Sequence, residues 1–596
     1  MRVDGYAPIE DYAAIGDGRT VGLVARDGSL DWLCLPDLDS PPAFGRLLDA
    51  EAGGSFVLQP AEPCESDRRY LPDTNVLETT YRSASGTARV TDAMTIAKGG
   101  DLPPLREVVR RVEGLAGSMP FRWIFDPRFG YGRQAPSLRD VGGRLVAVVG
   151  KDALALGVFG AAAAEASRGE AAGRFEVRAG EQALLVLTAA NREPLVLPDR
   201  DAGERRLEAT ASFWRAWAGR IAYDGPWRNH VVRSALALKL LVHSPSGAIV
   251  AAATTSLPEW IGGERNWDYR FAWVRDAALT LVTFLRLGFV QEPRAFLWWL
   301  AHATALTHPR LDPLYSLDGG PSRPEEELAR VPGYRDSRPV RVGNGARDQL
   351  QLDVYGYALH AFWRHTEETS GLSGAQGRTV AKIADWVADH WREPDSGIWE
   401  VRSAPTHFIQ SKAMCAVALE RACDLAEKGL VPDRRVRWAE ASAEIRAYVD
   451  ERGWDERRQS FVRAPDLREA DGSLLTLALL GYEDARSARI RGLIRELRSS
   501  LGNGSLLDRY RYGDGLRGPQ GIFITCSFWL ASVLARAGEV EAAADLLDRL
   551  VLFSNDVGLY AEEVEPGGRL LGNFPQALVH LALIDAALDV AEAPAR

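Results

Sequence analysis

Aromatic and charged side chains alternate through residues 259–276 in a mixture that ordinary packing seldom needs. The aromatic members are Trp260, Trp267, Tyr269, Phe271 and Trp273, and the charged members are Arg265, Asp268, Arg270, Arg275 and Asp276. Aromatic faces can cover the apolar C–H faces of a sugar ring, while carboxylates and guanidinium groups can hydrogen-bond its hydroxyls. The stretch is therefore a candidate carbohydrate cradle. The alternative is an aromatic-rich helix start whose charges form a solvated face.

Two further segments carry carboxyl groups suited to breaking a glycosidic bond, a reaction that typically uses one acid to protonate the leaving oxygen and one to activate water or attack the sugar. Glu400 follows Trp399 in an expected loop between two helices, where desolvation would raise its pKa as a general acid requires. Glu562, Glu563 and Glu565 lie in a loop before a long apolar helix. The alternatives are a surface acid at a turn and a solvated acidic turn, and spacing alone does not choose among the three glutamates.

Other catalytic patterns are missing from the sequence. No GxSxG or HExxH motif occurs, and the nine histidines do not cluster with carboxylates at metal-ligand spacing. We therefore expect neither a metal nor a cofactor. The five cysteines are scattered without CxxC spacing, which argues against a disulfide framework or a zinc site and indicates a reducing cytoplasm.

Length and charge narrow the class of partner. At 596 residues the chain exceeds one ordinary core, so two domains, or one large repeat-built domain plus a smaller one, are expected. A formal charge of −10 offers no electrostatic footprint for nucleic acid or an anionic membrane, and no apolar run approaches the roughly 18 residues of a spanning helix. A small neutral molecule fits better as a ligand, and a homo-oligomer is compatible with these numbers.

The pattern up to residue 200 is that of short strands separated by Gly-rich turns, which predicts an antiparallel β-sandwich over residues 1–200. Strands are expected at 20–26, 29–35, 75–82, 87–94, 107–112, 144–149, 153–159, 174–178 and 183–187. A helix over 204–218 lies in a predicted linker, residues 201–225.

From residue 226 to 596, apolar residues recur at three- and four-residue spacing in about twelve segments. These are 227–243, 276–288, 291–306, 350–367, 375–391, 411–427, 433–450, 472–481, 484–500, 522–537, 540–553 and 573–591. Helices in antiparallel pairs could close into an (α/α)6 barrel, with loops at one end building the site. The long segment 307–349 interrupts this rhythm, and Tyr315, Tyr334, Trp298 and Trp299 in or before it favour a functional role.

Several motifs resemble those of glycoside hydrolase family 15, which contains glucoamylases, glucodextranases and trehalases. They are TTSLPEWIGGERNWDYRFAWVRD at 254–276, IGDGRT at 15–20, DGSLDWLCLP at 27–36, GYRDSRPVRVGN at 333–344, QLQLDVYG at 349–356, GIWE at 397–400 with SK at 411–412, CSFW at 526–529 and GNFPQA at 572–577. The resemblance covers nearly the whole chain in family order. It implies a β-sandwich followed by an (α/α)6 barrel and an inverting mechanism.

The same resemblance implies roles for individual residues. Glu400 corresponds to the general acid and Glu562 to the general base, with Glu563 a neighbour. Arg275 and Asp276 resemble the pair that binds hydroxyls of the terminal glucose. Further walls and donors of that subsite are implied for Tyr269, Trp273, Trp399 and Arg509. An inverting pair should hold its carboxyl groups roughly 6.5–9.5 Å apart.

The sequence departs from the family pattern at Tyr357 and Gln520, where acids are common, and within residues 406–410. These departures bear on linkage preference. The first hypothesis is an exo-acting α-glucoside hydrolase that releases β-glucose from short α-glucans or isomalto-oligosaccharides. Trehalase, with the same catalytic pair, is the alternative, and an inverting disaccharide phosphorylase or a non-catalytic sugar-binding protein ranks lower.

Overall fold

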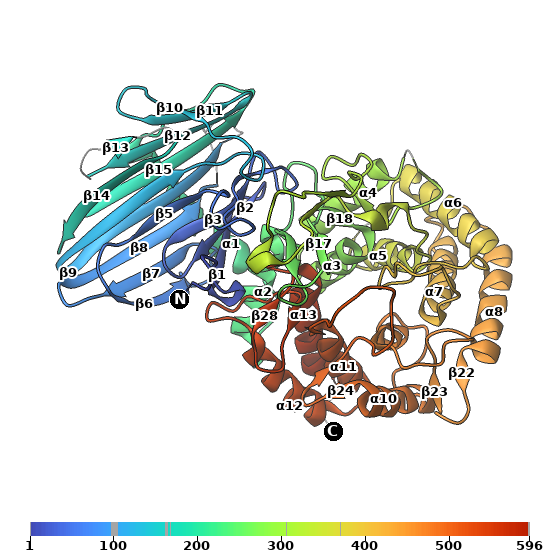
Figure 1. Cartoon of the computed structure of the whole chain (residues 1–596). Coiled ribbons are helices and arrows are strands. Elements are labelled where there is room, and N and C mark those ends of the chain that lie inside the picture. The colour runs from blue at the N-terminus through green and yellow to red at the C-terminus, as the bar shows by residue number, and fades with distance from the viewer. Residues whose placement is uncertain are drawn as a thin grey trace.

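A computed structural model describes residues 2–96, 105–160, 165–166, 169–305, 307–369 and 371–593. Strands fill most of the chain up to Asn191 and helices dominate from Arg200 onward (Figure 1). The chain is thus a sheet-rich N-terminal part followed by a helical C-terminal part. Within the described ranges, no helix combines the length and apolar character needed to cross a membrane.

One long strand, β9, belongs to both halves of the N-terminal sheet. The strands are β1 (Tyr12–Gly16), β2 (Val21–Ala25), β3 (Ser29–Cys34), β4 (Pro42–Phe44), β5 (Ser55–Pro60), β6 (Glu65–Tyr70), β7 (Leu77–Arg82), β8 (Gly86–Met94), β9 (Arg106–Asp126), β10 (Ser137–Asp140), β11 (Leu145–Val149), β12 (Asp152–Phe159), β13 (Glu165–Ala166), β14 (Ala171–Arg178) and β15 (Gln182–Asn191). The first half of β9 pairs with β8 and β15, and the second half pairs with β5 and β14. All pairings are antiparallel.

The predicted strands all overlap strands of the structure, but the length of β9 was underestimated. The pattern predicted a strand only over 107–112, whereas β9 runs from Arg106 to Asp126. Gly114, Gly117 and Pro120 interrupt its sequence, and such residues weaken a strand interior. Pairing on both sides keeps them in the ladder nevertheless.

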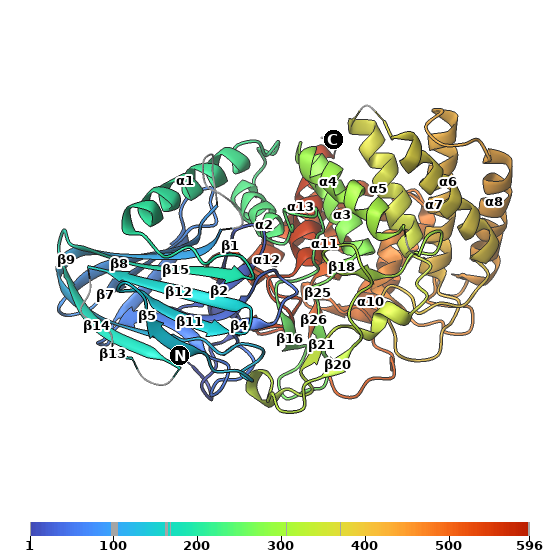
Figure 2. The same cartoon turned by 90° about the horizontal axis from the view of Figure 1, so that it is seen from above.

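Helix α1 (Arg200–Ala218) follows the sheet and lies across one of its faces (Figure 2). Asp199 caps the helix, because its side chain accepts a hydrogen bond of 2.9 Å from the backbone N–H of Ala202. Leu207, Trp214 and Trp217 form its buried side, and the helix contacts β8, β9 and β15. The helix predicted over 204–218 is therefore present and begins slightly earlier.

Each of the predicted helical segments after residue 226 contains a helix. They are α2 (Arg228–Leu240), α3 (Val274–Arg286), α4 (Gln291–Ala303), α5 (Val354–Glu368), α6 (Gly374–His390), α7 (Ile409–Glu427), α8 (Arg435–Arg452), α9 (Thr476–Leu479), α10 (Ala488–Leu501), α11 (Thr525–Arg536), α12 (Val540–Leu550) and α13 (Ala577–Glu592). Successive odd-numbered helices from α3 to α13 contact one another, and α13 returns to contact α3. Around them, α4 packs on α3, α6 and α8 on α7, α12 on α11, and α2 on α13.

Direct hydrogen bonds tie the N-terminal sheet to the stretch 259–276. Arg270 is fully buried and donates to the Ser40 carbonyl and to the Tyr131 hydroxyl, each at 2.8 Å. Its guanidinium also pairs with Asp268 at 2.7 Å. Arg270 and Asp268 therefore fasten the two parts of the chain together. Neither residue lines the two site cavities described below. These two members of the predicted sugar cradle therefore have a structural role.

The segment 307–349 is held by short pairings such as β18 (Ala272–Trp273) with β19 (Leu314–Tyr315). The aromatic side chains that favoured a functional role lie outside the cavities described below. Tyr334 is buried and donates to the Ala7 carbonyl at 3.0 Å, Trp299 donates to the Leu317 carbonyl at 3.0 Å, and Trp298 is exposed. The segment reaches the candidate site through its other end, at residues 344–349.

Candidate active site

The structure brings all the predicted site residues together at one cavity. Its lining contains Tyr269, Trp273, Arg275, Asp276, Trp399, Glu400, Arg509 and Glu562. These side chains come from the first turn of α3 and the segment just before it, the loop before α7, the loop before α11, and the segment between α12 and α13. Residues separated by almost 300 positions in the chain therefore face the same space.

Glu400 lies in a tight turn that two unusual backbone conformations create. Its own φ is 57° and that of Gly397 is 65°. A β-carbon at position 397 would lie 2.7 Å from the Phe408 ring, so glycine is required there for space as well as for conformation. A left-handed non-glycine residue costs free energy and is most often kept at functional sites. The turn aims the Glu400 carboxyl into the cavity.

Glu400 is poised to hold a proton. Trp273 Nε1 donates a hydrogen bond to Glu400 Oε1 at 2.7 Å, and Arg275 lies 3.5 Å from the same oxygen. Burial raises the pKa of Glu400, and the Arg275 charge opposes part of that rise. A carboxyl group with a raised pKa and restricted solvent access suits a general acid.

Arg275 and Asp276 occupy the first turn of α3. Arg275 Nε donates to Asp276 Oδ2 at 2.9 Å, and its Nη1 donates to the Ile398 carbonyl at 2.6 Å, within the turn that carries Glu400. The carboxylate of Asp276 is stabilised by its position in the first turn of α3, because the helix dipole favours negative charge there. Together they present a fixed array of donors and acceptors to the cavity.

The three acids of the 562–565 segment lie in three different environments. Glu562 lines the cavity, whereas Glu563, the first residue of β27 (Glu563–Val564), is fully buried beside Arg509 at 3.3 Å. Glu565 lies in the following turn and pairs with Arg569 at 3.5 Å. Of these three acids, Glu562 is the one that lines the cavity.

Charge and burial both act on Glu562. Burial and the neighbouring Glu259 carboxylate raise the pKa of Glu562 to about 8, while Arg509 opposes the shift. Gly572 makes room for this carboxyl: a β-carbon there would lie 2.7 Å from Glu562 Oε2, and the φ of Gly572 is +74°. The pKa of Glu562 therefore lies far above that of an ordinary glutamate.

Two of the departures from the family pattern form a pair, and the third contacts a predicted site residue. Gln410 Nε2 donates to the Tyr357 hydroxyl at 3.0 Å. Gln520 Oε1 accepts from Arg509 at 2.7 Å, and Arg509 also donates to Glu259 at 2.7 Å. These substitutions therefore act through buried hydrogen bonds directly behind the cavity.

A second cavity adjoins the first and shares Tyr269, Trp399, Glu400 and Arg509 with it. Its other walls come from Glu259, Arg265, Trp267, Asn344, Ala346, Gln349, Val401, Arg402, Tyr510, Asp514 and Leu516. Arg265 forms a two-pronged ion pair with Asp514, at 2.6 and 2.8 Å, and Tyr510 donates to the same carboxylate at 2.7 Å. This pair ties the loop before α11 to the stretch 259–276 across the second cavity.

Sequence reasoning missed several residues that support this site. Asp471 accepts from Trp399 Nε1 at 2.8 Å and so fixes the ring beside Glu400. Glu259 accepts from Trp267 Nε1 at 2.9 Å. The residue type of Asp471 is typical of a helix N-cap, and Asp471 does cap residues 472–475. Its hydrogen bond with Trp399 joins it to a loop far away in the sequence and has no local sequence signal.

The sequence of the chain is similar to known families and to known proteins over nearly its whole length. Residues 225–588 match the family described as glycosyl hydrolases family 15, and residues 3–213 match a trehalase-like N-terminal domain. The chain is 36% identical to a trehalase of Mycobacterium tuberculosis over 99% of this chain and 90% of that protein. It is 33% identical to a trehalase of Thermoplasma volcanium over 100% of this chain and 95% of that protein.

Among solved structures, a bacterial glucoamylase in complex with acarbose has a similar fold. The TM-score is 0.70 at 14% sequence identity, with 99% of this chain and 95% of that chain covered.

Proposed function

Because the chain belongs to glycoside hydrolase family 15 and is a glycosidase, we propose that it hydrolyses α,α-trehalose, with Glu400 as general acid and Glu562 as general base. The relatives named trehalases align over almost the whole chain, which favours this substrate over the short α-glucans expected first from the sequence. The observation that carries the mechanism is one cavity lined by both carboxyl groups, in which Trp273 and Arg275 contact the Glu400 carboxyl.

The proposed reaction proceeds by inversion. Glu400 protonates the oxygen between the two glucose units as the bond breaks, and Glu562 takes a proton from a water molecule that attacks from the opposite face. Arg275 and Asp276 hydrogen-bond the hydroxyls of the glucose that is attacked. Trp273 and Arg275 hold the Glu400 carboxyl toward the bond.

The second cavity supplies the place for the leaving glucose. It lies beside Glu400, and Arg265 and Asp514 close it with a buried ion pair. A cavity bounded in this way suits a disaccharide, because no third sugar ring has to extend beyond it. A longer glucan would need a path past that pair.

The architecture belongs to the same proposal. We infer a β-sandwich over residues 1–200, a helical linker over 201–225 and an (α/α)6 barrel over 226–596; within the barrel range, 306, 370 and 594–596 lie outside the described residues. The circular order of contacts from α3 through α13 supports the barrel. The cysteines are free, which supports a reducing compartment such as the cytoplasm.

Proton NMR of the first products tests the substrate and the mechanism together. Trehalose has two α anomeric centres, so an inverting enzyme should release equal amounts of α- and β-glucose before mutarotation. Retention would give α-glucose alone and would contradict the assigned roles. Maltose, isomaltose, nigerose and kojibiose in parallel test the substrate, because faster hydrolysis of any of these would return the assignment to an α-glucan hydrolase.

A further inference from the structure

A separate cavity lies at the other ends of the inner helices. It is lined by residues of α3, α5, α9, α11 and α13 and of the segment 484–486, with Arg286, Arg536 and Glu592 in the last turns of their helices. The candidate active site lies at the opposite, amino-terminal ends of α3 and α13. Trp529 separates the two spaces: it lines this cavity, and its ring centroid lies 6.3 Å from that of Trp399.

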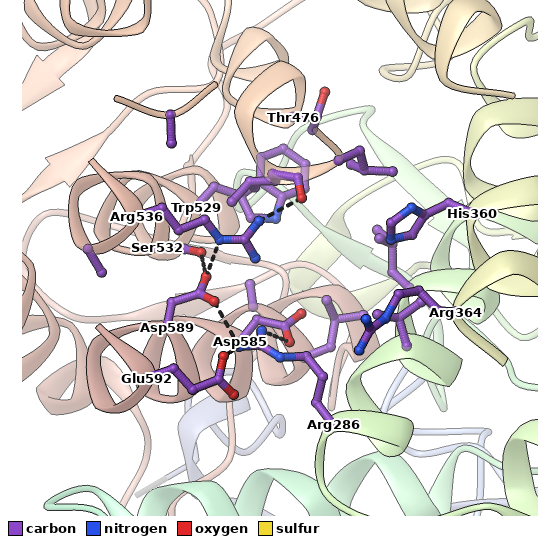
Figure 3. A pocket seen from close by; sticks show the side chains of 18 of the residues that line it. Arg286, His360, Arg364, Thr476, Trp529, Ser532, Arg536, Asp585, Asp589 and Glu592 are labelled. Carbon is purple, nitrogen blue, oxygen red and sulfur yellow. Dashed lines mark hydrogen bonds and ion pairs between the residues drawn. The ribbon is translucent and has the colours of Figure 1, made fainter. Parts of the chain in front are cut away.

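The carboxylates on the α13 side of this cavity are already engaged. Arg286 donates to Asp585 and Asp589 at 2.8 Å each and to Glu592 at 3.0 Å. Asp589 also accepts from Arg536 at 2.8 Å and from the Ser532 hydroxyl. Figure 3 shows this ladder of ion pairs along one wall. Each of its three acids therefore accepts from at least one of its two arginines.

The α5 side of the cavity carries arginines whose ion pairs with neighbouring acids are long. Figure 3 shows His360 and Arg364 across the cavity from Asp589 and Glu592. Arg364 reaches Glu368, one helical turn away and nearly half exposed, only at 3.6 Å. Arg421, which contacts His360, reaches the partly exposed Asp424 at 3.5 Å, donates to the Leu480 carbonyl at 3.0 Å and lies over the Trp363 ring. Neither arginine lies in the last turn of its helix, so the helix dipole does not account for them.

His360 adds a hydrogen-bond donor to this wall. Arg421 Nε donates to His360 Nδ1 at 3.4 Å, so the neutral ring carries its proton on Nε2. Burial and the charges of Arg421, Arg364 and Arg536 lower the pKa of His360 to about 3. The ring is therefore neutral at physiological pH and behaves as a donor surrounded by cations.

We propose that this cavity binds a small molecule through an oxyanion group, with Arg364 and His360 as its ligands. Asp484 also lines the cavity and accepts from the Arg486 backbone N–H at 2.9 Å. With these carboxylates engaged, the α5 side offers donors, and donors with positive charge select a phosphate, sulfate or carboxylate group. Trp529, Leu279 and Val282 supply apolar surface for the remainder of such a molecule. The site is distinct from the cavity of Glu400 and Glu562 and does not depend on the function proposed there.

Calorimetric titration at constant ionic strength tests the site with two probes, sodium sulfate and sodium succinate. Each should bind the full-length protein at one site, and Arg364→Gln should weaken binding about tenfold or more, as expected for loss of a charge-assisted hydrogen bond. Binding of only one probe would support the site and assign its preference to tetrahedral or carboxylate anions. Absence of saturable binding for both would overturn the proposal.

Arg200→Gln is the matched control. Arg200 also pairs with a glutamate one turn away, Glu204 at 3.8 Å, and its replacement changes net charge by the same amount. This variant should bind both anions like the unmodified protein. Equal affinity in Arg364→Gln and Arg200→Gln would overturn the assignment. In ¹³C-histidine NMR, bound anion should raise the pKa of His360, whereas an anion bound elsewhere would leave it unchanged.

Discussion

Trp273 and Glu400 are joined by a hydrogen bond of 2.7 Å from the indole Nε1 to Oε1. Trp273 is the N-cap residue of α3, and Glu400 lies in the strained turn before α7. The bond thus joins the aromatic stretch to the proposed general acid. In the proposed mechanism, the stretch therefore positions the general acid as well as forming a wall of the glucose site.

Replacing Trp273 by Phe should keep an aromatic side chain at this position and remove the hydrogen bond to Glu400. The bond stabilises the ionised carboxylate, so its loss should raise the pKa of Glu400 further, and the alkaline limb of kcat/KM should move to higher pH. We also expect kcat to fall about tenfold because the carboxyl group is less well oriented. Trp299→Phe is the control, since its Nε1 bonds the Leu317 carbonyl outside the cavity. An unchanged pH profile in Trp273→Phe would contradict the coupling.

Within residues 259–276, sequence pattern could predict which residues matter but not what each one contacts. Arg270 and Arg275 look alike in the sequence, yet Arg270 faces the N-terminal sheet and Arg275 faces the cavity. Their difference arises because the chain passes from β17 (Asn266–Asp268) to α3 between them, where the sheet contacts the helical part. Such contacts are set by tertiary packing and leave no local periodicity.

The helices were predictable for a physical reason. Each buries an apolar side against its neighbours, so the three- and four-residue spacing of apolar residues is imposed directly on the sequence. Spacing alone could not separate Glu562 from Glu563, although the family resemblance did, because adjacent residues of an extended segment point in opposite directions and only a fold or a motif says which one faces inward. The ion pair of Arg265 with Asp514 joins positions 249 apart and could not be predicted from either segment alone.

Replacing either proposed catalytic glutamate by glutamine should abolish most turnover while sugar binding is retained. General acid–base assistance typically contributes about 10²–10⁴-fold, so kcat of Glu400→Gln and Glu562→Gln should fall within that range. Glu565→Gln, in the turn beyond β27, should keep near-normal kcat. Hydrolysis at a near-normal rate by either cavity variant would remove that residue from its assigned role.

The raised pKa of Glu562 predicts a pH dependence of stability. The folded-state pKa is about 8 against an ordinary value of 4.5, so the folded state retains a proton that the unfolded state loses between these pH values. The contribution to stability is fully present below the lower value and is lost as pH rises through the higher one, at up to about 1.4 kcal/mol per pH unit. Glu562→Gln should therefore show a shallower fall in the free energy of unfolding, measured by urea denaturation across this range. A slope identical to that of Glu565→Gln would refute the prediction.

The ion pair of Arg265 with Asp514 should decide how well the leaving glucose is enclosed. Asp514→Asn keeps the shape of the side chain but removes its charge, so the loop before α11 should be held less firmly over the second cavity. We expect kcat/KM for trehalose to fall about 10- to 100-fold, because small losses of positioning are costly. The ratio of maltotriose to trehalose hydrolysis should rise, because the path past the pair is opened. Asp433→Asn disrupts an exposed pair of similar geometry with Arg435 and should leave both substrates unaffected. If Asp514→Asn and Asp433→Asn share the same substrate ratio, the pair does not restrict substrate length.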